Sequence, residues 1–188
     1  MGRVEIYYGM SGTFKTTTIN KKHKNEVIII SAIKDWKHFR TKLFPWLVGE
    51  TNLNYSLLHL VRLKDSMEKS QDYIIERGIT DSLYYEYQKQ PTLITPSIIS
   101  SAVKQESDII SNVGNVHKIL LTMHDEKFIA EKVLSEITRA ECFQGVEDYM
   151  KKQEDYVKFT KAYNDITEII EIKDAREYLE SLGIEYNV

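Results

Sequence analysis

Residues 7–19, YYGMSGTFKTTTI, combine glycine, lysine and hydroxyl side chains at a spacing that suits the binding of phosphate groups. Gly9 and the pair Lys15-Thr16 fit the ends of the pattern G-x-x-x-x-G-K-[ST], but Phe14 stands where the second glycine belongs. In such a loop, backbone N–H groups converge on an anion, the lysine reaches the terminal phosphates and the hydroxyl reaches magnesium. The residues expected to bind the donor nucleotide are Gly9, Met10, Ser11, Gly12, Thr13, Phe14, Lys15, Thr16 and Thr17.

The alternative interpretation of this stretch is an ordinary glycine-rich turn between a strand and a helix. Its position directly after a β-rich run, residues 3–9, favours the phosphate site, because the positive end of the following helix adds to anion binding. Similar loops with phenylalanine before the lysine occur in some ATP-binding phage recombinases, so Phe14 is compatible with a working site of altered shape.

A second group of polar residues lies in IIERGITDSLYYEY, residues 74–87. Glu76 is suited to the ligand shell of magnesium, and Arg77 is suited to an acceptor phosphate, because its guanidinium makes two parallel bonds to phosphate oxygens. In isolation, an ordinary surface ion pair would be the better explanation of both residues. The phosphate-binding pattern upstream favours the functional interpretation.

The hydrophobic periodicity predicts strands that alternate with helices. Such alternation is typical of a parallel sheet with right-handed crossovers, in which ligands bind beyond the carboxyl ends of the strands. Asp81, Asp125 and Asp174 are expected to cap helices, and Gly183 is expected just past the end of the last one. The predicted strands are 3–9, 26–33, 72–76, 117–123 and 165–172, and the predicted helices are 15–24, 36–48, 54–69, 81–89, 96–113, 125–137, 144–163 and 174–183.

The composition is that of a globular protein with a real core. The 188 residues fit one domain, and the formal net charge of −3 argues against long polynucleotides as main ligands, although it leaves a local basic groove open. One cysteine, Cys142, excludes an internal disulfide framework and fits a reducing compartment. No apolar run is long enough to span a membrane and no signal peptide is expected, so the predicted location is cytoplasmic.

The sequence resembles the P-loop kinases that phosphorylate deoxynucleosides and thymidylate. The stretch ERGITDSLYYEYQ is similar to the D-R-Y-x-x-S-x-x-x-Y-Q of thymidylate kinases and to the E-R-S of deoxynucleoside kinases, with Asp81 in place of the serine and Glu86 in place of the glutamine. ILLTMHDEKFIAEKVL (119–134) looks like the strand and helix before their lid, and ITRAECFQGVEDYMKKQEDY (137–156) looks like the lid and the following helix.

This resemblance covers nearly the whole chain. It implies a single kinase domain over residues 1–188, with the three-layer P-loop NTPase fold: a five-stranded parallel sheet flanked by helices, and a small lid near residues 138–145. ATP and Mg²⁺ are the implied cofactors, and Thr16 and Glu76 the implied metal-binding residues. The implied catalytic residues are Lys15, Glu76, Arg77 and the lid arginine Arg139, for which a solvated helix-end cation is an equal alternative.

The sequence leaves the phosphoryl acceptor open between a deoxynucleoside and a deoxynucleoside monophosphate. Deoxynucleoside kinases carry E-P-x-x-x-W after the second strand, and the glutamate of this stretch acts as the catalytic base. SAIKDW (31–36) has Ser31 at the position of that glutamate. A sugar hydroxyl needs a base, but a phosphate acceptor is already ionised and needs cations. Ser31 therefore favours a deoxynucleoside monophosphate as the acceptor, with thymidylate as the first candidate. The deoxynucleoside alternative stays open, because Asp35 could be a displaced base. The R-E-P-G-G stretch of thymidylate kinases is also absent, so neither group of kinases matches fully.

Several residues near the expected acceptor pocket are candidates for substrate binding, although core packing or a solvated helix face is the better explanation of most of them in isolation. A P-loop ATPase or switch without a small-molecule acceptor is a further alternative, motivated by Phe14. The divergence at small size is what we expect of a phage-encoded kinase, which would act in the host cytoplasm, and homodimers are common among kinases of this kind. The substrate-binding candidates are Asp35, Trp36, Arg40, Tyr55, Arg62, Arg77 and Tyr85.

Overall fold

A computed structural model describes residues 2–23, 28–31, 59–61, 63–65, 67–68, 71–136 and 143–186, with the backbone alone for 28–31. Five strands form one parallel sheet in the order β2-β3-β1-β4-β5. The strands are β1 (Gly2–Tyr8), β2 (Ile28–Ser31), β3 (Tyr73–Glu76), β4 (Gly114–Met123) and β5 (Glu168–Ile172). The helices are α1 (Lys15–Lys22), α4 (Ile79–Lys89), α5 (Pro96–Ser111), α6 (Glu126–Phe128), the π-helical turn η1 (Ile129–Val133), α8 (Val146–Tyr163) and α9 (Ala175–Ser181).

Strand β1 lies in the middle of the sheet, between β3 and β4. Its residue Ile6 is in register with Ile75 of β3 and with Lys118 of β4. Val4, Ile6 and Ile75 are fully buried, as expected of strands that helices cover on both faces. This arrangement brings the carboxyl ends of β1 and β3 side by side, where the loop after β1 and the Glu76-Arg77 pair both begin.

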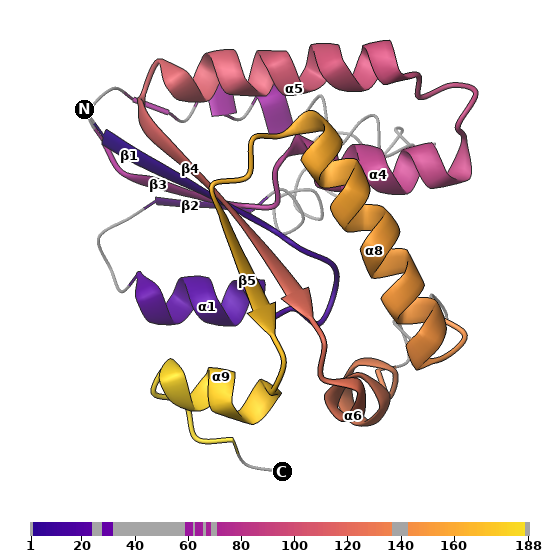
Figure 1. Cartoon of the computed structure of the whole chain (residues 1–188). Helices are drawn as coiled ribbons and strands as arrows, with labels where there is room; N and C mark the ends of the chain where they lie inside the picture. The colour runs from indigo at the N-terminus through magenta and orange to yellow at the C-terminus, as the bar shows by residue number, and fades with distance from the viewer. Residues whose placement is uncertain are drawn as a thin grey trace, which may run out of the picture.

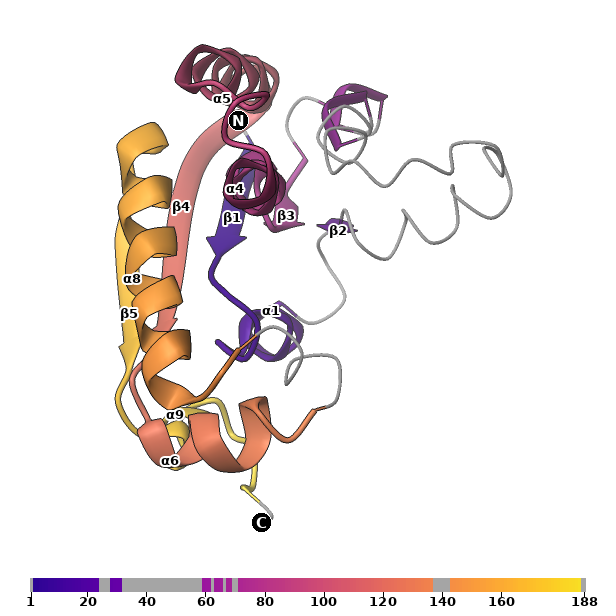
Figure 2. The same cartoon turned by 90° about the vertical axis from the view of Figure 1, so that its right-hand side faces the viewer.

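Helices cover both faces of the sheet. Figure 1 shows α4, α5 and α8 on one side and α1 and α9 on the other, and Figure 2 shows α6 and α9 together at the end of the molecule toward which β4 and β5 run. The predicted caps Asp125 and Asp174 are confirmed, because their side chains accept hydrogen bonds of 2.9 Å from the backbone N–H groups of Phe128 and Glu177. The predicted parallel sheet flanked by helices is confirmed.

Two local predictions were wrong. Asp81 does not cap its helix, because α4 begins two residues earlier at Ile79 and the Asp81 side chain lies buried inside the protein. The helix predicted over 125–137 is not one regular α-helix: after one short turn it widens into a π-helical turn, Ile129–Val133, which buries Ile129 and Val133. Such turns are often found at functional sites.

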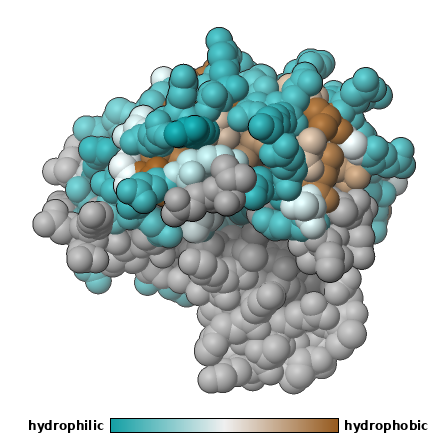
Figure 3. Space-filling view, turned by 90° about the horizontal axis from the view of Figure 1, so that it is seen from below, coloured by the Kyte–Doolittle hydropathy of each residue, from teal (hydrophilic) through white to brown (hydrophobic). Residues whose placement is uncertain are grey.

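The described surface is largely polar on the face that carries α6 and α9, with apolar residues scattered over it (Figure 3). Among the described residues, no helix is both long enough and apolar enough to cross a membrane. The predicted helix 36–48 lies outside the described residues, and of 54–69 the described parts 59–61 and 63–65 are helical. The single domain over 1–188 and the lid limits near 138–145 stay predictions.

Candidate active site

The loop between β1 and α1 has the backbone shape that its glycines predict. Gly9 and Gly12 have φ values of 148° and 88°, which favour glycine. A Cβ on Gly9 would lie 2.7 Å from the backbone oxygen of Leu121, and a Cβ on Gly12 would lie 2.6 Å from Cγ2 of Val133. Both glycines are therefore needed for conformation and for space.

Lys15, the first residue of α1, is 5% exposed and folds back over the loop. Its Nζ donates hydrogen bonds to the backbone oxygen of Gly9, to that of Met10 at 2.7 Å and to Oγ1 of Thr13 at 3.3 Å. Gly9 and Met10 hold the lysine through their carbonyl oxygens. The loop thus fixes a positive charge at the start of a helix, where the helix dipole adds to it.

Phe14 adopts a left-handed backbone conformation, which favours glycine. Its φ and ψ are 56° and 21°, in the left-handed region that costs a non-glycine residue about 1–2 kcal/mol. The ring packs against Phe128, with 4.8 Å between centroids, and stacks on Tyr178 at 6.1 Å. These aromatic contacts offset the backbone cost, so the loop keeps its shape with a phenylalanine at this position.

The two predicted metal-binding residues lie together. The hydroxyl of Thr16 donates a hydrogen bond to Oε1 of Glu76, which is 7% exposed at the end of β3. Oxygen ligands of this kind suit Mg²⁺, which binds few protein groups and keeps several waters or substrate oxygens. Among the described residues, no group of three or more His, Cys, Asp or Glu side chains is placed to hold a metal. A hydroxyl and one carboxylate therefore fit magnesium bound mainly through phosphate oxygens.

Arg77 follows Glu76 with a φ of 75°, and its N–H donates to the backbone oxygen of Tyr7 at 3.0 Å. Burial works against the charge of its guanidinium, but Asp81, Tyr85 and other neighbours outweigh this and raise the pKa of Arg77. In the described part of the chain, Phe14 and Arg77 are the non-glycine residues with positive φ. Unfavourable backbone conformations of this kind gather at functional sites.

Helix α8 holds the loop through polar side chains on its buried face. The hydroxyl of Tyr149 donates to the backbone oxygen of Ser11 at 2.9 Å, and the side-chain amide of Gln153 bonds both the N–H and the carbonyl of Met123 at the end of β4. The hydroxyl of Tyr156 accepts a hydrogen bond of 2.9 Å from the N–H of Gly9 and donates to Oδ1 of Asp81. The spacing 149, 153 and 156 is that of one helix face, and it was the available sequence signal for this contact.

These parts enclose a cavity of about 310 Å³. Its cations are Lys15, Arg77 and Lys132, and its carboxylates are Glu76 and Glu136. The sequence interpretation did not include Lys132 or Glu136. The lining residues are Ser11, Gly12, Thr13, Phe14, Lys15, Thr16, Thr17, Glu76, Arg77, Phe128, Lys132 and Glu136.

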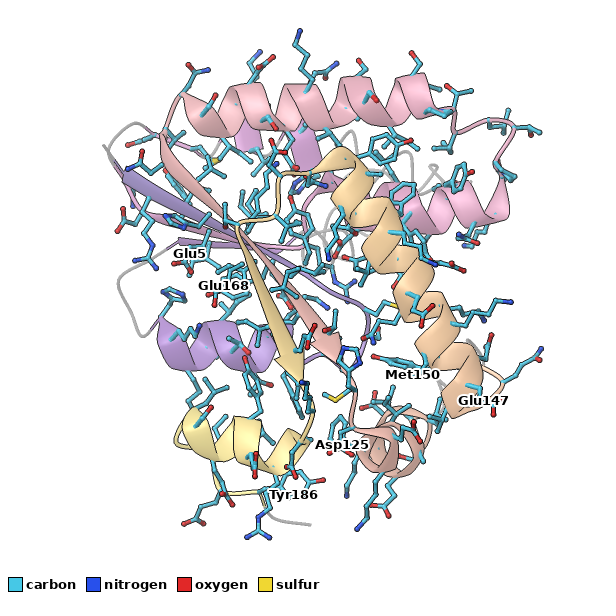
Figure 4. All side chains as sticks on the ribbon, in the orientation of Figure 1. Glu5, Asp125, Glu147, Met150, Glu168 and Tyr186 are labelled. Carbon is cyan, nitrogen blue, oxygen red and sulfur yellow. The ribbon has the colours of Figure 1, made fainter. Side chains whose placement is uncertain are left out.

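A second cavity of about 240 Å³ lies between α6 and α9 and shares Phe128 with the first. Asp125 and Tyr186, both labelled in Figure 4, are among its lining residues. Asp125 also accepts a hydrogen bond of 2.9 Å from the N–H of Ala175, which ties the start of α9 to the start of α6.

The predicted site residues fall into two sets. The loop residues, Glu76 and Arg77 come together as described, and Tyr85 is close enough to Arg77 to act on its charge and packs edge-on against Tyr84 at 5.4 Å. The remaining candidates lie outside the described residues, so their roles stay predictions. These are Asp35, Trp36, Arg40, Tyr55, Arg62 and Arg139.

No protein-family model matches the chain, and no curated protein sequence matches it. Among solved structures, a shikimate kinase from Bacteroides thetaiotaomicron is similar, with 15% identity, a TM-score of 0.52, and coverage of 96% of this chain and 93% of that one. A thymidylate kinase from Candida albicans has 14% identity and a TM-score of 0.49, over 91% of this chain and 84% of that one. At these identities the likeness concerns the fold alone. Together with the glycine loop and its lysine, the similarity to shikimate kinase shows that the chain has the P-loop kinase fold.

Proposed function

We propose that the chain transfers the γ-phosphoryl group of ATP to the phosphate of a deoxynucleoside monophosphate, with thymidylate as the first candidate. The observation that carries this proposal is one cavity lined both by the phosphate-binding loop and by Glu76 and Arg77. Its volume of about 310 Å³ is in the range of small-molecule sites.

The donor phosphates would lie against the loop. Lys15 and the backbone N–H groups of the loop supply positive charge there, and Lys132 on η1, which packs against the loop through Val133, adds a further cation. Thr16 and Glu76 would hold Mg²⁺, which supplies neutralisation of the phosphate charge when bound. The neighbouring cavity, which shares Phe128, offers space for the rest of the donor nucleotide.

The acceptor would lie on the side of Arg77. A guanidinium that is always charged suits an acceptor with a phosphate group. The carboxylate of Glu76 already accepts the hydrogen bond of Thr16, which favours a metal-binding role over that of a base for a sugar hydroxyl. Positioning and charge stabilisation suffice for transfer between phosphates, and Arg139 of the predicted lid would add a further cation during closure.

The test is ADP formation from ATP and Mg²⁺ with each deoxynucleoside, each deoxynucleoside monophosphate and shikimate, the acceptor in the name of the similar structure, as separate acceptors. The proposal expects one or more monophosphates to raise turnover, and Lys15→Ala to abolish it while the protein stays folded. Turnover with a bare deoxynucleoside would instead favour the 5′-hydroxyl as acceptor, with Asp35 as the base to test. ATP binding without response to any acceptor would overturn the proposal in favour of an ATPase or switch.

A further inference from the structure

Helix α8 and helix α4 meet behind the phosphate-binding loop through a buried pair of side chains. Tyr156 is 1% exposed and Asp81 is 1% exposed, and the hydroxyl of the tyrosine donates to Oδ1 of the aspartate. The same phenol oxygen accepts the N–H of Gly9, the first glycine of the loop. Because the phenol has one proton, its donation to Asp81 fixes the orientation in which it receives Gly9.

The other oxygen of the carboxylate faces the second half of the site. Oδ2 of Asp81 lies 3.9 Å from Nη1 of Arg77 and accepts no hydrogen bond in the described part of the protein. At this distance and burial the attraction between the two charges is strong. The Arg77 side chain is 19% exposed and lines the cavity.

The local structure of α4 does not need this carboxylate. Gly78 at its N-terminus has no side-chain cap, and the N–H of Ile79 is bound by Oε1 of Glu106 at 2.8 Å. A buried carboxylate with one unbonded oxygen is costly. Asp81 lies between the phosphate-binding loop and Arg77, and this position offers a functional reason for the energetic cost of burying its carboxylate.

We propose that Asp81 and Tyr156 form a positioning pair that couples the phosphate-binding loop to Arg77. One carboxylate oxygen fixes the start of the donor loop through the tyrosine, and the other orients the cation expected to meet the acceptor. The inference rests on the proposed function for the acceptor half and on nucleotide binding for the donor half.

Charged and titratable groups around Asp81 set its response to pH. Burial raises the pKa of Asp81 to about 6, with Arg77, Lys15 and the Tyr156 hydrogen bond opposing the rise and Glu106 adding to it. Above this pH the carboxylate is charged and attracts Arg77; below it the group is neutral and the attraction is lost. The coupling is therefore expected to weaken in mild acid.

The first experiment compares three variants in direct ATP binding and in steady-state turnover. Asp81→Asn keeps an oxygen for Tyr156 but loses the charge, so kcat is expected to fall about tenfold or more while the Kd for ATP changes less than about threefold. Tyr156→Phe removes the bond to Gly9, so the Kd for ATP is expected to rise about fivefold to tenfold. Tyr84→Phe is the matched control, because its buried ring packs on Tyr156 at 5.2 Å while its hydroxyl donates only to the backbone oxygen of Lys152.

The pH dependence separates this role from a merely structural one. The acceptor phosphate titrates at about pH 6 in every variant, so the comparison rests on the difference between two profiles. As the pH is lowered from 7.5 to 5.5, the kcat of the wild type is expected to fall more steeply than that of Asp81→Asn, because only the wild type also loses the charge of Asp81. Equal profiles for the two proteins, or equal effects of Tyr156→Phe and Tyr84→Phe on ATP affinity, would overturn the proposal.

A binding-only experiment keeps the inference testable if no acceptor is turned over. Tyr156→Phe, Arg77→Met and the double variant are compared in ATP affinity as a double-mutant cycle. Coupling predicts that the double variant deviates by about threefold or more from the product of the single effects. Additive effects would reject the coupling, whereas a silent wild type in the turnover assay would reject only the kinase proposal.

Discussion

The hydroxyl of Thr16 donates a hydrogen bond to Oε1 of Glu76, a residue 60 positions further along the chain. The contact forms because β1 and β3 are neighbours in the sheet and Tyr7 is in register with Glu76. It joins the start of α1 to the end of β3, so the loop after β1 and the Glu76-Arg77 pair share a fixed geometry. In the proposed function, these two oxygen groups would bind the nucleotide-bound Mg²⁺.

Glu76→Gln tests this relationship. The amide keeps the size of the side chain but loses the charge, so we expect the Mg²⁺ concentration that gives half-maximal turnover to rise about tenfold or more. The measurement is a Mg²⁺ titration at fixed ATP. Glu136→Gln is the control, because this carboxylate lines the same cavity at an exposed position. The same shift in both variants would mean that the cavity responds to overall charge and that Glu76 has no specific role at the metal.

The meeting of the loop with Glu76 and Arg77 could be predicted from the sequence, because it follows from strand order alone. Continuous β-branched runs and helix caps such as Asp125 are local signals, and parallel sheets place the residues after their strands at one edge. No local signal of this kind predicted the role of Asp81. An aspartate near a helix start favours a cap, but its partner Tyr156 lies 75 positions away.

Phe14 provides a test of backbone strain. At φ 56° an alanine would keep the unfavourable conformation and lose the ring, whereas glycine would lose the ring and relieve the strain. We therefore expect Phe14→Gly to be more stable than Phe14→Ala by about 1 kcal/mol, although glycine is normally the less stable of the two in a helical start. Chemical denaturation of both variants measures this difference.

The ATP affinity of Phe14→Gly is part of the same test. Because glycine restores the usual loop pattern, ATP binding should stay within about threefold of the wild type. A Phe14→Ala variant that is as stable as Phe14→Gly would show that the left-handed backbone at this position carries no strain.

Gly12→Ala tests the packing between the loop and η1. The added Cβ would meet Cγ2 of Val133 at 2.6 Å and would sit on a backbone with φ of 88°, so we expect a loss of about 2–4 kcal/mol in the free energy of unfolding. Gly183→Ala measures the loss of stability that comes from the positive φ alone, because the φ of Gly183 is 69° and nothing lies within 4 Å of the added Cβ. It should cost only about 1–2 kcal/mol.

The steric part can be identified separately. In a Val133→Ala background, Gly12→Ala should cost about 1 kcal/mol less than in the wild type, because the contact with Cγ2 is gone. Equal costs of Gly12→Ala in both backgrounds would show that η1 does not press on the loop.

Lys132, a further cation that lines the cavity, provides another test. It comes from a π-helical turn that periodicity cannot predict, since the turn departs from the regular helical spacing. Lys132→Ala should raise the KM for ATP about threefold to tenfold, because one cation is lost near the donor phosphates. Lys158→Ala, which removes an exposed cation from α8, is the control for a change in net charge. An equal effect of the two substitutions on the KM would exclude a specific contact with the donor.

The stability of Asp81→Asn relative to the wild type should depend on pH. Burial raises the pKa of Asp81 from 3.8 to about 6, so the folded protein holds this proton more tightly than the unfolded chain does. Below about pH 4 the Asp81 carboxyl is protonated in both the folded and the unfolded protein, and its tighter proton binding stabilises the fold. As the pH rises through the folded pKa near 6, this contribution to the free energy of unfolding is lost. Asparagine does not titrate, so the variant should gain about 1–3 kcal/mol in the free energy of unfolding relative to the wild type between pH 4 and pH 7.

Chemical denaturation at several pH values measures this gain, with Asp155→Asn on the exposed face of α8 as the control for removal of a carboxylate. A difference in the free energy of unfolding that stays constant between pH 4 and pH 7 would contradict a buried carboxylate that titrates in this window. A variant that is more stable but less active at neutral pH would show that the charge of Asp81 supports the activity and destabilises the fold.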